Sequence, residues 1–79
     1  MPDLKPDLIL DNSGLCCPMP IIKTKKAMDG MKVGEILKMV ATDPGSVSDI
    51  QAWVKKTGQE LVEHGTEGDK FVFYIRKVK

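Results

Sequence analysis

The stretch Gly14-Leu15-Cys16-Cys17-Pro18-Met19-Pro20 has the pattern of a helix start, and the organisation of the chain can be worked out from it. Because proline lacks an N–H group and its ring clashes with the preceding turn, Pro18 and Pro20 cannot lie inside a helix. The first turn of a helix accepts both, since its N–H groups have no intrahelical partner. The sequence therefore predicts a helix over residues 18–29, with Gly30 as its stop.

The segment before this helix has the pattern of a short strand. Leu8-Ile9-Leu10 suits a strand, and Asp11-Asn12-Ser13-Gly14 forms a turn signal behind it. Residues 1–7 contain two prolines and three charges ahead of any apolar pattern. We therefore expect residues 1–7 to be a loose lead-in.

Apolar spacing after the first helix predicts a second strand and a second helix. Residues 35–41 form an almost continuous apolar run, which is typical of a well-covered internal strand. Apolar residues then recur at helical spacing over residues 47–54, and Gly58 is a natural stop. At the start of this second helix we expect Asp43 to cap N–H groups and Pro44 to occupy the first turn.

Two further strands complete the pattern. Residues 59–64 predict a third strand, residues 65–69 a hairpin loop, and residues 71–75, dense in aromatic and β-branched side chains, a fourth strand. The two βα units imply parallel pairing, and the closing hairpin adds an antiparallel pair. The predicted fold class is α/β (α+β): a βαβαββ two-layer sandwich with both helices on one face of a four-stranded mixed sheet.

Length and composition indicate the class of protein. The chain of 79 residues has room for a single domain over residues 1–79, and 42% hydrophobic with 29% charged residues is ordinary for a soluble protein. It has no apolar run near the ~20 residues of a membrane span and no signal-peptide core, so we expect no membrane association and a cytoplasmic location. The net charge of +1 makes no overall case for nucleic-acid binding.

The only two cysteines are adjacent, which argues against a structural disulfide framework. Cys17 falls at or just before the N-terminus of the first predicted helix. Free backbone N–H groups and the positive end of the helix dipole favour a thiolate there, and the thiolate is the nucleophilic form. This placement predicts a reactive cysteine rather than a structural one.

The motif Leu10-Asp11-x-x-Gly14-Leu15-x-Cys17-Pro18-x-Pro20 resembles the signature of the TusA/SirA/YedF family of small sulfur-carrier proteins. The similarity continues in residues 34–37, in Asp43-Pro44 and in Asp49-Ile50, so it extends over about residues 8–77. The resemblance implies the same βαβαββ two-layer fold that the apolar pattern predicts.

The resemblance also implies a function. Cys17 is then the catalytic residue, which accepts a sulfane sulfur as a persulfide from a cysteine desulfurase or a rhodanese-type donor. It passes that sulfur to an acceptor protein, such as a DsrE-type relay, in a sulfurtransferase reaction that needs no metal or organic cofactor. The supporting motif consists of Gly14, Leu15, Pro18 and Pro20.

Two positions depart from the family pattern. Met19 lies between the prolines, where members that act in tRNA thiolation typically carry Glu, so the resemblance leaves that pathway open. Cys16 is an additional thiol with three open interpretations. It is a small apolar filler, a resolving thiol that discharges the persulfide, or a ligand of a metal site shared with His64.

Lysines of the first predicted helix lie close to the cysteines. Lys23, Lys25 and Lys26 form either a solvated helix face or, together with Met19, a docking patch for an acidic partner. Trp53 is expected in the core rather than in a binding site. The alternative function is a non-catalytic regulatory or protein-interaction module, while the charge balance disfavours RNA binding.

Overall fold

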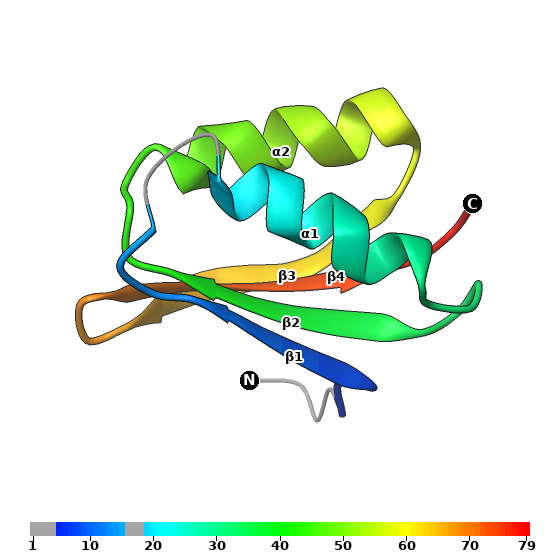
Figure 1. The fold of residues 1–79 in the computed structure, drawn as a ribbon, viewed down its shortest axis with the longest axis horizontal. Coiled ribbons are helices and arrows are strands. Elements are labelled where there is room, and N and C mark those ends of the chain that lie inside the picture. The colour runs from blue at the N-terminus through cyan, green and yellow to red at the C-terminus, as the bar shows by residue number, and fades with distance from the viewer. Residues whose placement is uncertain (1–4, 16–18) are drawn as a thin grey trace.

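The computed structural model describes residues 5–15 and 19–79, and its six elements follow the predicted order. They are β1 (Leu8–Asn12), α1 (Met19–Asp29), β2 (Ile36–Ala41), α2 (Ser46–Thr57), β3 (Glu60–Glu67) and β4 (Lys70–Arg76). Both helices cover one face of a four-stranded mixed sheet (Figure 1), which confirms the predicted two-layer sandwich. Neither helix within the described ranges has the length and apolar character needed to cross a membrane.

The strands lie in the order β1-β2-β4-β3, and parallel pairing forms only between β1 and β2. β4 is antiparallel to both of its neighbours, so it separates β2 from β3. The expectation of parallel pairing from the second βα unit is therefore wrong. β4 takes the internal position because its apolar residues need cover on both faces: Phe73 is 1% exposed and Tyr74 7%. The polar strand β3 is left at the edge, where charged side chains discourage further pairing.

The core lies between the helices and the sheet. Alternate residues of β2 point toward the helices, and Leu37, Met39 and Ala41 are completely buried there. Met28 from α1 and Ile50 from α2 pack in the same cluster. Burying a side chain of this size contributes about 2 kcal/mol, so this shared core holds both helices on the sheet.

The hairpin between β3 and β4 is tighter than the sequence predicts. β3 continues to Glu67 and the turn consists of Gly68 and Asp69, whereas a loop over residues 65–69 was expected. Gly68 has φ of 61°, a left-handed conformation typical of two-residue hairpin turns. The end of β3 is exposed and polar, so it carries no apolar alternation from which a strand could be predicted.

α2 begins later than expected. Gly45 is its N-cap and makes no side-chain capping bond, while Pro44 lies in the turn before the helix. The Asp43 carboxylate accepts a hydrogen bond from the Gly45 N–H, with Oδ1 at 3.1 Å. Asp43 thus shapes the turn before the helix, because its side chain reaches the N–H two residues ahead. At the other end, Gly58 with φ of 78° closes α2 as predicted.

The residue before β1 is tied to the sheet. The Asp7 N–H donates to the Ile36 carbonyl at 2.8 Å, and the Ile36 N–H donates to Asp7 Oδ2 at 2.9 Å. Asp7, which was expected in the loose lead-in, is therefore held against β2; residues 1–4 of that lead-in lie outside the described residues.

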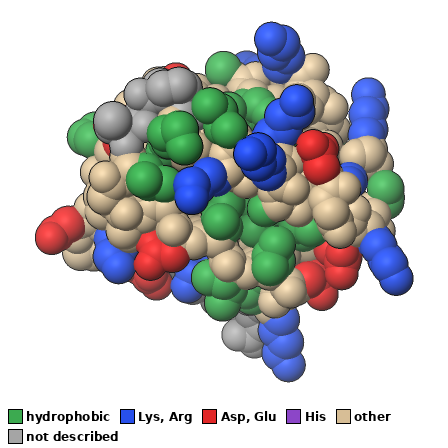
Figure 2. Space-filling view, in the orientation of Figure 1, with side chains coloured by type: hydrophobic (Ala, Val, Ile, Leu, Met, Phe, Trp, Pro, Cys, Tyr) green, Lys and Arg blue, Asp and Glu red, His purple; other side chains and the backbone are tan. Residues whose placement is uncertain are grey.

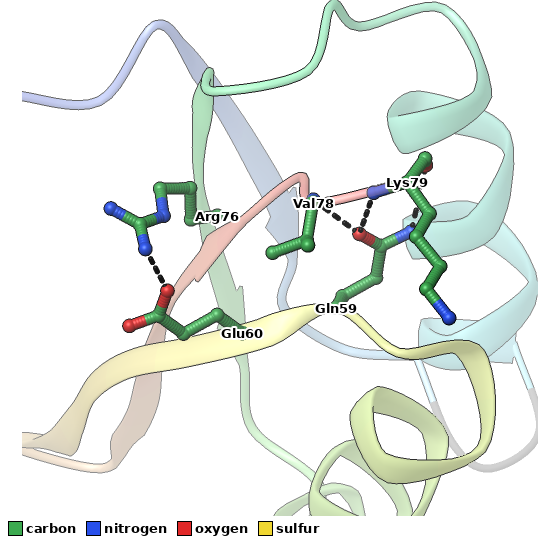
Figure 3. A network of polar contacts seen from close by, with 5 residues as sticks. All are labelled: Gln59, Glu60, Arg76, Val78 and Lys79. Atoms are coloured by element: carbon green, nitrogen blue, oxygen red, sulfur yellow. Dashed lines mark hydrogen bonds and ion pairs between the residues drawn. The ribbon is translucent and has the colours of Figure 1, made fainter.

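The C-terminal end of the chain is held by the side chain of the residue just before β3 (Figure 3). Gln59 Oε1 accepts hydrogen bonds from the N–H groups of Val78, at 2.6 Å, and Lys79, at 3.2 Å. Beside it, Arg76 and Glu60 form an ion pair across β3 and β4. These contacts fasten the segment after β4 at the end of the molecule where α2 terminates.

Candidate functional site

The candidate site lies where β1 leads into α1. The carboxyl ends of β1 and β2 and the N-termini of α1 and α2 gather at this one end of the molecule (Figure 1). Sites in sheets with parallel strands favour such an edge, since helix N–H groups and loops meet there. Cys16, Cys17 and Pro18 lie outside the described residues, so the site is defined by the residues on either side of them.

Three hydrogen bonds donated by backbone N–H groups shape the turn that precedes the cysteines. The Ser13 N–H donates to Asp11 Oδ1 at 2.9 Å, the Gly14 N–H to Thr42 Oγ1 at 2.9 Å, and the Leu15 N–H to the Asn12 carbonyl at 3.1 Å. Thr42 directly follows β2, so this turn is tied to the end of the neighbouring strand.

Gly14 has a conformational reason to be glycine. Its φ is 82°, in the left-handed region that residues with a Cβ atom rarely adopt. A Cβ at Gly14 would meet nothing within 4 Å, so the requirement comes from the backbone angle and not from space. The sequence motif and the backbone geometry thus both favour glycine at position 14.

Asp11 carries a stable negative charge at this turn. The adjacent Ser13 side chain and the hydrogen bond from the Ser13 N–H lower the pKa of the Asp11 carboxyl, and the Lys70 ammonium lowers it further. Asp11 therefore remains a carboxylate, and an acceptor for Ser13, well below neutral pH.

The first turn of α1 is anchored on its buried side. Pro20, Thr24 and Met28 point inward at successive turns of the helix. The Pro20 carbonyl accepts hydrogen bonds from Thr24 Oγ1 at 2.7 Å and from Asn12 Nδ2 at 3.3 Å. The second bond joins the end of β1 to the start of α1. Pro20, a residue of the predicted motif, is thus a buried anchor of the helix rather than a surface group.

The opposite side of α1 is open to solvent. Met19 is 40% exposed and the lysines predicted for docking, Lys23, Lys25 and Lys26, are all exposed. Ile22 adds a further apolar side chain with 42% exposure. Figure 2 shows hydrophobic and lysine side chains next to one another on this face of the molecule. The structure therefore makes all four predicted docking residues accessible on one element.

A groove of about 320 Å³ runs between α1 and α2 on this side. Its lining combines aliphatic, aromatic and cationic side chains: Ile21, Ile22, Lys25, Trp53, Lys56 and Thr57. Trp53 packs partly against the core, as expected, and also forms a wall of the groove.

Sequence analysis did not assign Trp53 and Lys56 to a site. Their spacing of three residues, which puts them on one face of α2, is the signal that would have found them. A second hollow, of about 470 Å³, lies between α2 and β3, and none of the predicted site residues lines it.

The described part of the chain contains no preformed cluster of metal-ligating side chains. Within residues 5–15 and 19–79, no three His, Cys, Asp or Glu side chains converge to hold a metal ion. His64, the ligand considered for a metal site shared with Cys16, stacks on Phe73 with ring centroids 6.5 Å apart.

Comparison with known proteins identifies the family. The family model described as sulfurtransferase TusA matches residues 8–77. The chain belongs to the sulfurtransferase TusA family. A relative from Allochromatium vinosum, named sulfur carrier protein TusA, is 52% identical over 71 residues, which cover 90% of this chain and 93% of that protein. A Pseudomonas putida protein of the same name is 36% identical over 77 residues, covering 98% of this chain and 96% of the relative.

A solved structure agrees with the TusA-family fold. The crystal structure of a SirA-like protein from Desulfitobacterium hafniense superposes with a TM-score of 0.78 at 20% identity. The match covers 91% of this chain and 99% of the other. The family resemblance and the fold that it implied are both confirmed.

Proposed function

We propose that this TusA-family protein is a sulfur carrier, which takes up sulfane sulfur as a persulfide on Cys17 and passes it to a thiol of an acceptor protein. One observation carries the proposal: the family match spans residues 8–77, and this range contains Cys17 directly before Pro18 in the sequence. The relatives named sulfur carrier protein support the same role.

Sulfur uptake is a thiol exchange in which atoms and electrons balance. The Cys17 thiolate attacks the outer sulfur of a donor persulfide, the donor's S–S bond breaks, and the donor cysteine leaves as a thiolate. In delivery, an acceptor thiolate attacks the outer sulfur on Cys17, and the Cys17 thiolate leaves. Neither step changes the number of electrons in the system, so the exchange itself requires no oxidant, metal or organic cofactor.

The part of the chain that follows Cys17 favours the thiolate form of this residue. Cys17 precedes the first residue of α1 by two positions, and a helix N-terminus stabilises a nearby anion. Lys23 and Lys25 add positive charge within the first two turns of α1. Each effect lowers the pKa of a thiol from its free value of about 8.5, and so increases the nucleophilic fraction at neutral pH.

The exposed side of α1 and the groove beside it provide a docking surface for the donor and the acceptor. Met19, Ile22 and Trp53 offer apolar contact, while lysines line the groove and the rest of the helix face. Such a surface fits a partner segment that places acidic residues around an apolar side chain. The donor is a cysteine desulfurase or a rhodanese-type protein, and the acceptor is a DsrE-type relay or another thiol protein. A reducing cytoplasm suits the carrier, the donor and the acceptor, because it keeps their thiols reduced.

The test is the intact mass of the purified protein after incubation with a cysteine desulfurase and cysteine, or with polysulfide, in the absence of reductant. Wild type, Cys16→Ser and Cys17→Ser are compared. We expect a gain of one or more sulfur atoms that reductant removes and that only Cys17→Ser lacks. Loading that is lost in Cys16→Ser instead would move the site to Cys16. No loading of any variant by either donor would favour the non-catalytic interaction module.

A further inference from the structure

Asn12 is a polar residue in an apolar position. Leu8, Leu10 and Asn12 alternate toward the helix side of β1, and Asn12 lies opposite Ala41 of β2. The Asn12 side chain is completely buried, although an amide is costly to remove from water unless it is hydrogen bonded. Packing alone would be served by an apolar residue here, so the amide calls for another explanation.

Asn12 contacts both sides of the segment that carries the cysteines. Its main-chain carbonyl accepts a hydrogen bond from the N–H of Leu15, the residue directly before Cys16, at 3.1 Å. Its side-chain Nδ2 donates to the Pro20 carbonyl at 3.3 Å, in the first turn of α1. Asn12 Oδ1 is also buried, and it finds no hydrogen-bond partner within residues 5–15 and 19–79. One residue of β1 therefore bridges the two ends of the segment.

The helix does not need this bridge for its own hydrogen bonding. The Thr24 hydroxyl already donates to the same Pro20 carbonyl, at the shorter distance of 2.7 Å. The Thr24 bond lies within α1, whereas the Asn12 bond joins α1 to the strand. Asn12 thus links Leu15, through its main-chain carbonyl, to Pro20, through its side chain. These two residues lie on either side of the cysteines in the sequence.

We propose that Asn12 is a positioning residue, which holds the two ends of the cysteine segment together and so keeps the Cys17 thiolate at the start of α1. The inference rests on the proposed sulfur-carrier function and adds a residue to it. Removing the amide unties the first turn of α1 from β1, and we expect the Cys17 thiolate to lose part of the stabilisation that a helix N-terminus provides.

The test is the pH profile of the alkylation rate of Cys17 by iodoacetamide, measured in a Cys16→Ser background. We expect Asn12→Ala to move the midpoint of this profile upward, toward the value of about 8.5 for a free thiol. An upward shift of one pH unit lowers the thiolate fraction at neutral pH about tenfold. The greater nucleophilicity of a more basic thiolate offsets part of that loss, which leaves a rate decrease of about threefold.

Thr24→Val is the matched control, because it removes a buried hydrogen bond to the same carbonyl without untying the strand from the helix. We expect it to lower the unfolding midpoint and to leave the pH profile where the parent has it. Asn12→Val, which suits a buried strand position, carries the test if Asn12→Ala does not fold.

Three outcomes would reject the positioning role of Asn12. They are an unchanged pH midpoint in the Asn12 variants, an equal shift in Thr24→Val, or loss of folding in both Asn12 variants while Thr24→Val folds. Sulfur loading of the parent protein separates the two proposals. A parent that takes up no sulfur contradicts the carrier function, while the alkylation profile still reports on Asn12.

Discussion

At the scale of single residues, Gly14 is the clearest structural requirement beside the cysteines. Its left-handed backbone, with φ of 82°, brings its N–H to the Thr42 hydroxyl. Because a Cβ at this position would meet no atom within 4 Å, replacing Gly14 tests the backbone angle alone.

We expect Gly14→Ala to lower the free energy of unfolding by about 1 kcal/mol, the cost of a left-handed conformation for an L residue. The measurement is urea unfolding at equilibrium. Gly65→Ala is the matched control, since Gly65 also has open space at its Cβ but no positive φ. We expect its effect to be about 0.5 kcal/mol or less in either direction. Equal losses in the two variants would contradict a role for the Gly14 backbone angle.

At the scale of secondary-structure elements, α1 and α2 form the two walls of one groove. Lys25 and Lys56 come from different helices but line the same groove. A charged surface accelerates encounter with an oppositely charged partner, and salt weakens this effect. The two lysines should therefore matter for sulfur transfer between proteins and not for reaction with a small donor.

We expect Lys25→Glu and Lys56→Glu each to slow sulfur uptake from a donor protein by about threefold or more at low ionic strength, with the difference shrinking as salt is added. Uptake from polysulfide should stay at the wild-type rate. Lys32→Glu makes the same charge change just beyond the other end of α1, and should leave both rates near wild type. An equal effect of all three variants would indicate a response to net charge instead of docking.

The same elements show what could be predicted from the sequence. α2 and β4 were predicted to within a residue or two, because helical spacing and a dense β-branched and aromatic run are local signals. The position of β4 between β2 and β3 was not, since it depends on which strand most needs cover on both faces. The far end of β3 was missed because an exposed edge strand needs no apolar alternation.

The candidate site was predictable in the same uneven way. Gly14, Leu15 and Pro20 could be assigned from the motif, and the exposure of the α1 lysines followed from their charge. The roles of Asn12 and Trp53 could not, because each depends on a contact with a distant part of the chain. Asn12 reaches Pro20, eight residues away, and Trp53 faces the side of α1 across the groove.

At the scale of the whole molecule, the candidate site and one of the fold's anchors lie at opposite ends of α1. Met19 begins the helix beside the cysteine segment, whereas the far end is held by the segment after β4. Lys77 Nζ donates to the Met28 carbonyl at 2.6 Å and to the Met31 carbonyl at 2.9 Å. This lysine adds a charged donor to the carbonyl of Met28, in the last turn of α1, and to that of Met31, just beyond the helix, and it ties the C-terminal segment to α1.

We expect Lys77→Met to lower the free energy of unfolding by about 2 kcal/mol, because two carbonyls lose a charged, partly buried donor. Equilibrium unfolding in urea measures this loss. Lys32→Met removes an exposed lysine of the neighbouring loop and should cost about 0.5 kcal/mol or less. The alkylation profile of Cys17 should stay unchanged in the folded Lys77 variant, since the anchor lies a helix length away from the cysteine segment. A shifted profile would show that the anchored end of α1 also affects the reactivity of the Cys17 thiol. The Lys77 contacts would then not act on stability alone.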